Sequence, residues 1–167
     1  RGTTVGCDCG DGWRWEVRDG RLWLTPAEPP PAFHYTFAVP GRVWIAETGQ
    51  TLRVRAAEPA AWMFRGAPGR AGLALPLHPG DTVVVRTRLP GDRLRPLGAP
   101  GNRRLKEVLI DRGIPRRERD RLPLLVVGRR IAWVPGVTIE DAFRLRPLVP
   151  VWIAELEGGM PSAVEAF

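Results

Sequence analysis

The sequence contains little cysteine or histidine and no long hydrophobic run, and each shortage argues against a class of protein. Cys7 and Cys9 are the only cysteines among 167 residues. They are too few for the disulfide framework of a small secreted domain, so we expect a reducing, cytoplasmic setting. No apolar run approaches the roughly 18 residues of a membrane span, so no membrane partner is expected. Residues 1–10 lack the apolar segment of a signal peptide, although a fragment that begins inside a longer protein would hide one.

The motifs of several enzyme classes are also missing. There is no Walker loop, no Gly-x-Gly-x-x-Gly and no Gly-x-Ser-x-Gly elbow. His34 and His78 have no Ser, Cys or Asp partner at an informative spacing, which argues against a catalytic histidine. Cys7-x-Cys9 is a poor zinc motif, because structural zinc sites usually use cysteines separated by about two to four residues. We therefore expect no catalytic residue, no cofactor-binding residue and no metal ligand in this chain.

Positive charge is abundant and unevenly distributed. The chain has a formal net charge of +7, and Lys106 is its only lysine. Residues 86–130 contain fourteen basic and five acidic residues, whereas the rest of the chain contains eleven basic and thirteen acidic residues. Such a concentrated basic region is what phosphate recognition requires, so an anionic partner is expected.

Short strands between turns dominate the predicted secondary structure. Alternation around Asp19-Gly20 predicts a hairpin over residues 13–24, and residues 124–127 and 130–134 predict a second one. The three prolines in residues 27–32 favour a stiff extended connector, and residues 149–156 suit an edge strand that leads into a loose tail. Further strands are predicted at residues 33–39, 42–46, 51–56, 71–77 and 82–87. The recurring Pro-Gly dipeptides favour type II turns with positive φ at glycine.

Helix is predicted only after residue 100. Asn102 can cap a helix over residues 103–112, and Gly113 is well placed to end it. A second short helix is predicted over residues 116–121, with Pro115 in its first turn. The buried side of the first helix is predicted to consist of Leu105, Val108 and Leu109.

The predicted fold class is α+β: a mostly antiparallel β body with a short helical insertion near residues 102–122. We divide the chain into an N-terminal hairpin with its connector (1–32), a main domain (33–148) and a C-terminal strand or tail (149–167). The seven tryptophans are interleaved with the β alternation. Most of them, Trp133 in particular, are predicted to be core anchors and not platforms for stacked bases.

The helical insertion carries most of the candidate RNA-binding residues. Arg103, Arg104 and Lys106 are predicted in the first turns of a helix, where backbone amides also attract phosphate. The alternative is a solvated surface on which charges pair with one another, and Asp92 and Asp120 are interpreted as such internal partners. The basic excess is larger than this pairing can neutralise. The candidate RNA-binding residues are Arg93, Arg95, Arg103, Arg104, Lys106, Arg112, Arg116, Arg117 and Arg119.

Five sequence blocks in a fixed order resemble the C-terminal domain of bacterial tRNA(Ile)-lysidine synthetases. Val39-Pro40-Gly41 and Glu47-Thr48-Gly49 are similar to the region that precedes it, so the resemblance covers about residues 36–146. The five blocks are Arg88 to Gly98 (RLPGDRLRPLG), Leu105-Lys106, Ile114-Pro115, Arg119 to Leu125 (RDRLPLL) and Ala132 to Gly136 (AWVPG).

The resemblance implies a ligase that uses ATP, with magnesium, to adenylate the wobble cytidine of tRNA(Ile) before lysine is attached. Its chemistry is expected in an N-terminal PP-loop domain, whose Ser-Gly-Gly-x-Asp-Ser motif is absent here. The last domain is expected to be PheT-like, similar to a β-rich module of the phenylalanyl-tRNA synthetase β chain, and to grip the acceptor-stem side of the tRNA. The family's lysine-rich positions fall at Arg103, Arg104 and Lys106. A homodimer of the intact enzyme is a possible assembly.

Two other functions stay open from the sequence. One is a small independent enzyme, such as a nuclease, for which no convincing catalytic cluster exists. The other is a protein-interaction module without RNA contact, in which residues 26–31 and 149–156 would act as docking strands. Binding by such a module would be insensitive to salt, unlike contact with phosphates.

Overall fold

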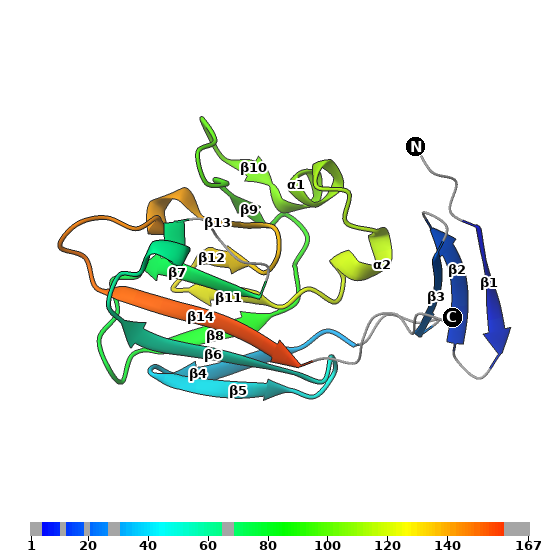
Figure 1. The fold of residues 1–167 in the computed structure, drawn as a ribbon, viewed down its shortest axis with the longest axis horizontal. Helices are drawn as coiled ribbons and strands as arrows, with labels where there is room; N and C mark the ends of the chain where they lie inside the picture. The colour runs from blue at the N-terminus through cyan, green and yellow to red at the C-terminus, as the bar shows by residue number, and fades with distance from the viewer. Residues whose placement is uncertain (1–4, 11–12, 19–20, 27–30, 65–68, 159–167) are drawn as a thin grey trace.

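The computed structural model describes residues 5–10, 13–18, 21–26, 31–64 and 69–158. At the N-terminus, three antiparallel strands form a small sheet in the order β1-β2-β3 (Figure 1). The strands are β1 (Val5–Gly10), β2 (Trp13–Arg18) and β3 (Arg21–Pro26). The predicted hairpin over residues 13–24 is therefore confirmed, whereas β1 was not predicted. The predicted connector lies mostly outside the described residues.

Two antiparallel sheets form the body of the chain (Figure 1). The five-stranded sheet has the order β13-β12-β11-β8-β4 and the four-stranded sheet has the order β5-β6-β14-β7. The first comprises β13 (Thr138–Ile139), β12 (Arg130–Val134), β11 (Leu124–Val127), β8 (Thr82–Arg86) and β4 (His34–Ala38). The second comprises β5 (Gly41–Ile45), β6 (Gln50–Ala57), β14 (Val151–Gly158) and β7 (Arg70–Ala74).

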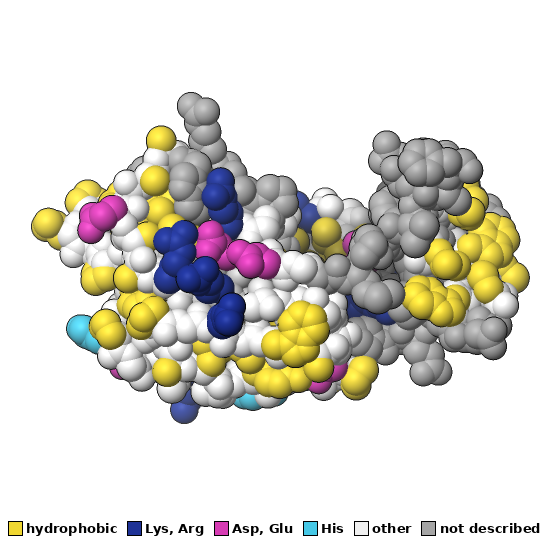
Figure 2. All heavy atoms as spheres, turned by 60° about the horizontal axis from the view of Figure 1, so that its bottom comes forward, with side chains coloured by type: hydrophobic (Ala, Val, Ile, Leu, Met, Phe, Trp, Pro, Cys, Tyr) yellow, Lys and Arg dark blue, Asp and Glu magenta, His cyan; other side chains and the backbone are white. Residues whose placement is uncertain are grey.

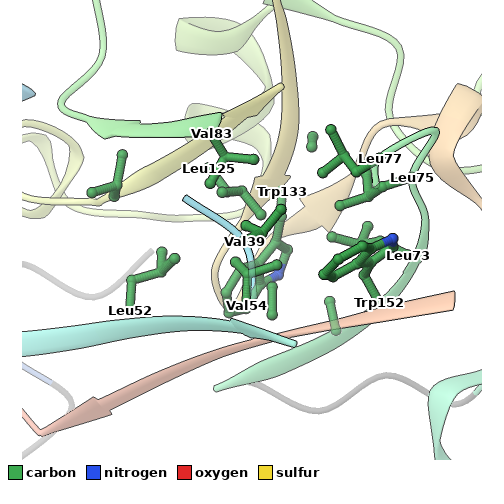
Figure 3. Packing of buried hydrophobic residues seen from close by; sticks show 14 of the residues in the cluster. Val39, Leu52, Val54, Leu73, Leu75, Leu77, Val83, Leu125, Trp133 and Trp152 are labelled. Carbon is green, nitrogen blue, oxygen red and sulfur yellow. The ribbon is translucent and has the colours of Figure 1, made fainter. Parts of the chain in front are cut away.

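The main core lies between these two sheets, as the close view in Figure 3 shows. Successive side chains of a strand point to opposite faces, so alternation decides which residues reach this core. On β6, Leu52 and Val54 are fully buried while Arg53 between them is exposed. The labelled core residues in Figure 3 are Val39, Leu52, Val54, Leu73, Leu75, Leu77, Val83, Leu125, Trp133 and Trp152.

The last strand is interior, and its prediction as an edge strand is wrong. Strand β14 pairs along its length with β6 and also with β7. Its first four residues are all buried, because the second face is covered as well. There Val151 and Ile153 pack against Met63 of the 3-10 helix η1 (Ala61–Phe64), a helical turn that the sequence did not predict. A strand paired on both sides cannot serve as the docking edge considered for a protein-interaction module.

The helical insertion begins later than predicted. Residues 103–104 form the short strand β10 (Arg103–Arg104), which pairs with β9 (Arg93–Leu94). Helix α1 (Leu105–Asp111) follows, with Arg104 as its extended N-cap residue and no side-chain cap. The predicted cap at Asn102 is wrong because pairing with β9 holds the next two residues extended. Gly113 ends the region with φ 69°, as expected, and α2 (Arg116–Arg119) follows.

The Pro-Gly dipeptides do not all form the same turn. Positive φ is found at Gly80, Gly91 and Gly136, as a type II turn requires, but not at Gly41. Gly41 is needed for another reason: a Cβ atom there would collide with the carbonyl oxygen of Ala38. Strands β4 and β5 therefore meet in a corner that only glycine permits. This corner links the two sheets.

Candidate nucleic-acid interface

The β9–β10 ladder brings two candidate arginines together. Arg93 and Arg104 are directly opposite each other in the register, and both are exposed. Directly opposed residues share one face of a strand pair, and like charges there repel. On the other face Leu94 is only 2% exposed and packs against Leu105 and Val108 of α1. The burial of Leu94 thus fixes the outward direction of both arginines.

Helix α1 adds a further cation beside this pair. Its buried side is Leu105, Val108 and Leu109, as predicted. Lys106 is exposed in the first turn, and Arg112 is exposed at the other end, about 9 Å away at the rise of an α-helix. Arg103, in contrast, is partly neutralised, because its Nη2 lies 2.7 Å from Oδ2 of Asp111. For Arg103, the alternative of a charge paired on the surface therefore applies. Both side chains are exposed, so the pair adds little stability.

Two of the candidate arginines are bonded to the backbone. Nε of Arg95 donates to the carbonyl oxygen of Ala99 at 2.7 Å, and Nε of Arg119 donates to that of Ile114 at 2.7 Å. Arg116 is exposed at the start of α2, whereas the side chain of Arg117 lies outside the described residues. Arg95 and Arg119 thus help to order their loops. Their contact with RNA stays a prediction.

Two aspartates, Asp92 and Asp120, hold the segments around the β9–β10 pair in place. Both carboxylate oxygens of Asp92 accept hydrogen bonds from Arg86 at 2.9 Å, and Oδ2 also accepts the amide of Leu89 at 2.7 Å. Nε of Arg88 donates to Asp120 at 2.8 Å. The interpretation of Asp92 and Asp120 as internal partners is therefore confirmed. The Arg86–Asp92 pair is largely buried, with side chains 12% and 13% exposed. The guanidinium of Arg86 and the carboxylate of Asp92 therefore neutralise each other inside the fold.

Two buried carboxylates that the sequence did not reveal anchor the loop after β9. Glu140 accepts the amide of Arg95 at 3.0 Å, and Asp141 accepts the amide of Gly98 at 3.0 Å. Burial raises the pKa of Glu140, although the hydrogen bond from Arg95 opposes this effect. The hydrogen bond from Gly98 lowers the pKa of Asp141, against the opposing effect of burial. Glu140 lies just before the short 3-10 helix η2 (Asp141–Phe143), and Asp141 is its first residue. No sequence pattern marked either residue as buried.

The charge on this surface is not cancelled internally. Among the described residues, no ion pair is found for five of its cations. We call this set the hairpin–helix surface; it comprises Arg93, Arg104, Lys106, Arg112 and Arg116. The excess of basic residues over acidic ones in the sequence therefore becomes exposed, unpaired charge in the fold.

Neither a cluster of metal-ligating side chains nor a membrane-spanning helix is present among the described residues. No group of three or more His, Cys, Asp or Glu side chains there could hold a metal ion. His78 is exposed and pairs with Asp81, while Cys7 and Cys9 are exposed free thiols. In the described part of the chain, no helix is long and apolar enough to cross a membrane.

The tryptophan prediction is only partly confirmed. Trp133 and Trp152 are core residues, with 3% and 2% of their surface exposed. Trp44 on β5 is 59% exposed, so it is one of the tryptophans that are not core anchors. Alternation explains the difference, because its neighbours Val43 and Ile45 point to the core side of the same strand.

Comparison with known proteins places this geometry in a family. The family model described as the TilS substrate C-terminal domain matches residues 83–152, which run from β8 into β14 and include the hairpin–helix surface. A solved structure described as the crystal structure of the TilS C-terminal domain is 25% identical, with a TM-score of 0.58. The match covers 75% of this chain and 98% of that chain.

The matches show a TilS C-terminal domain over residues 83–152 of this chain. A tRNA(Ile)-lysidine synthase of Symbiobacterium thermophilum is 42% identical over 107 residues, which are 64% of this chain and 22% of that protein. The tRNA(Ile)-lysidine synthase of Caldanaerobacter subterraneus is 46% identical over 63 residues, or 38% of this chain and 14% of that protein. The bifunctional protein TilS/HprT of Listeria monocytogenes is 46% identical over 56 residues, or 33% of this chain and 9% of that protein. The chain thus spans about a fifth, or less, of the length of these relatives.

The mostly antiparallel β architecture with a short helical insertion is confirmed by this TilS C-terminal domain structure. The likeness to the phenylalanyl-tRNA synthetase β chain stays a prediction.

Proposed function

We propose that this domain binds tRNA(Ile) and is a non-catalytic part of a tRNA(Ile)-lysidine synthase. The observation that carries the proposal is the hairpin–helix surface, whose cations are exposed and unpaired within the matched residues 83–152. The names of the relatives supply the tRNA and the lysidine reaction. The acceptor-stem side is the proposed contact, as the family resemblance implies.

The surface suits the backbone of a double helix. Guanidinium and ammonium groups that meet phosphates release condensed counterions, so affinity falls steeply as salt rises. Double-helical RNA is recognised mainly by its shape and its phosphates, and not by base edges in its narrow major groove. Arg93 and Arg104 provide two planar guanidinium groups, while Lys106 provides a point charge beside them. Strands β9 and β10 and helix α1 lie on a packed core, so the backbone positions of these three residues are fixed relative to one another.

A salt titration of tRNA binding tests this proposal. The unchanged chain should bind tRNA with a steep dependence on salt. The combined variant Arg93→Ala, Arg104→Ala and Lys106→Ala should lower the slope of log K against log salt by about 0.9 for each lost phosphate contact. Its melting temperature should stay within a few degrees, because all three side chains are exposed.

The matched control is the double variant Arg129→Ala and Arg146→Ala, which removes exposed arginines outside the hairpin–helix surface. It should change the slope much less than the combined variant. A change of slope in the control that is two thirds of the change in the combined variant, in proportion to the two and three charges removed, would show that only net charge matters. Binding of tRNA that is independent of salt would contradict phosphate contact. No binding of any tRNA at low salt would favour the protein-interaction alternative.

We assign the adenylation step, with its ATP and magnesium, to the part of the relatives' length that this chain does not span. The chain alone should therefore show no exchange of pyrophosphate into ATP and should form no lysidine on tRNA(Ile). Measurable tRNA adenylation by the purified chain would contradict this assignment. The cytoplasmic location and the homodimer stay predictions of the same resemblance.

A further inference from the structure

The outward face of the four-stranded sheet carries a second group of arginines. The register places Arg42 of β5 opposite Arg53 of β6, and Glu155 of β14 lies between Arg53 and Arg70 of β7. Directly opposed residues point to the same side of a sheet, so these four form one row across all four strands. Figure 2 shows Lys and Arg side chains in a line across this side of the molecule, with carboxylates beside them. The preceding positions of β6 and β14 point into the core, so the row is outward.

Two arginines of this row lack an acidic partner. The carboxylate of Glu155 accepts Nε of Arg55 at 3.3 Å, and within the described residues neither Arg42 nor Arg53 forms an ion pair. Both are exposed, and they face each other as like charges on neighbouring strands about 4.8 Å apart. Such a pair destabilises the sheet by itself. An anion bound between them would turn this repulsion into attraction.

A hollow of about 290 Å³ lies beside these arginines. Gly41 at the start of β5 has no side chain, and three of the lining residues are arginines. The hollow is lined by Pro40, Gly41, Arg42, Arg53, Val54 and Arg55.

An exposed aromatic ring continues the same face. Trp44 is two residues from Arg42 along β5, lies opposite Thr51, and is 59% exposed. Residues two apart on a strand share a face, so the indole stands next to the arginine row. An indole beside arginines is the combination by which proteins hold single-stranded nucleic acid, with bases stacked on the ring and phosphates on the cations.

The rest of this face is occupied, which limits the site to one half of the sheet. Met63 of η1 covers Val151 and Ile153 at the other end of β14. Arg42, Trp44, Arg53 and Arg70 are exposed, and the first three precede the matched residues 83–152. The site is therefore separate in sequence and on the surface from the hairpin–helix surface.

We propose that this half of the sheet, the sheet surface (Arg42, Trp44, Arg53, Arg55 and Arg70), binds a single-stranded RNA segment. A phosphate occupies the hollow between Arg42 and Arg53, and a neighbouring base stacks on Trp44. Duplex RNA is a poorer ligand, since its bases are already stacked and cannot reach the indole. The proposal does not depend on duplex contact by the hairpin–helix surface.

A fluorescently labelled oligouridylate of about eight nucleotides is the probe, with a blunt RNA duplex as the comparison ligand. The oligonucleotide should bind the unchanged chain at low salt. Trp44→Ala should weaken this binding by about tenfold, whereas Trp44→Phe should retain most of it. The double variant Arg42→Ala and Arg53→Ala should weaken it further and lower its salt slope by about 0.7 for each lost phosphate. Binding of the duplex should be nearly unchanged in all three.

The double variant Arg129→Ala and Arg146→Ala again provides the charge-matched control, and Arg42→Lys with Arg53→Lys should restore most of the binding. Failure of the oligonucleotide to bind, or equal losses in the control, would overturn the proposal. So would a Trp44→Ala variant that keeps full affinity. The combined variant of Arg93, Arg104 and Lys106 separates this result from the proposed function, because it should weaken the duplex and spare the oligonucleotide.

Discussion

The two basic surfaces of this chain are built by different means. The sheet surface follows from alternation alone: every second residue of β5 and β6 faces outward, and paired register lines them up. The hairpin–helix surface contains too little regular structure for that, since β9 and β10 have two residues each. It depends on buried leucines beneath it and on aspartates that fasten its loops. A sheet thus orients cations at little extra cost, whereas loops need dedicated supporting residues.

The difference also concerns where charge sits in the sequence. The arginines of the hairpin–helix surface lie in one basic stretch, and the sequence revealed them. Those of the sheet surface lie on β5, β6 and β7, between residues 42 and 70, where basic residues exceed acidic ones by only three. Local net charge therefore finds a densely basic segment and misses arginines that only strand pairing brings together.

The largest expected effect is on the support of the hairpin–helix surface. Leu109 is fully buried in the cluster that joins α1 to β11 and β12. Leu109→Ala should lower the free energy of unfolding by about 2–5 kcal/mol, because it leaves a cavity. Urea denaturation measures this loss. A loss below about 1 kcal/mol would mean that α1 is not held by this cluster.

A smaller effect is expected from the aspartate beneath the β8–β9 loop. Asp92→Ala should lower the free energy of unfolding by about 1–3 kcal/mol, since it leaves Arg86 and the amide of Leu89 without their acceptor. The control is Asp111→Ala, which breaks only the exposed pair with Arg103 and should change stability by less than about 1 kcal/mol. Similar losses in both variants would contradict the distinction between buried and exposed pairs.

The neighbouring carboxylates Glu140 and Asp141 should respond to pH in opposite directions. The pKa of Asp141 is lowered in the fold, so its contribution is complete above the unfolded-state pKa of about 3.9 and is lost as pH falls through the folded value. The pKa of Glu140 is raised, so its contribution is complete at low pH and falls as pH rises through the folded value.

Thermal melts from pH 3 to pH 7 measure this contrast. Asp141→Asn should lower the melting temperature at neutral pH and have less effect in acid. Glu140→Gln, which keeps an oxygen acceptor for the amide of Arg95, should have its most favourable effect at neutral pH. Parallel pH curves for both variants and the unchanged chain would contradict the opposite shifts.

The smallest effect belongs to the sheet surface. Arg42→Thr removes one of two opposed cations and introduces a residue that favours strands. Stability should therefore rise by about 0.2–1 kcal/mol, measured by urea denaturation. A clear loss of stability would show that Arg42 has a structural partner. The inference that Arg42 and Arg53 repel each other would then be wrong.

The sequence predicted most strands and the position of the helical insertion, since alternation and the Leu105–Val108–Leu109 spacing are local signals. It misplaced the helix start because the pairing of Arg103 and Arg104 with β9 is a contact between segments. It misjudged β14 for a similar reason: β6 and η1, which cover it, lie far away in the chain. Trp44 was missed because hydrophobicity alone does not say which face of an edge strand is covered.

Chemical modification of arginine by a dicarbonyl reagent, with and without tRNA(Ile), identifies the guanidinium groups that lie at the tRNA contact. Mass spectrometry of the modified chain reports each guanidinium separately. We expect tRNA to protect Arg93, Arg104, Arg112 and Arg116 and to leave Arg129 and Arg146 as reactive as in the free chain. Unchanged reactivity of all four arginines under conditions where tRNA is bound would contradict the hairpin–helix surface as the site of contact.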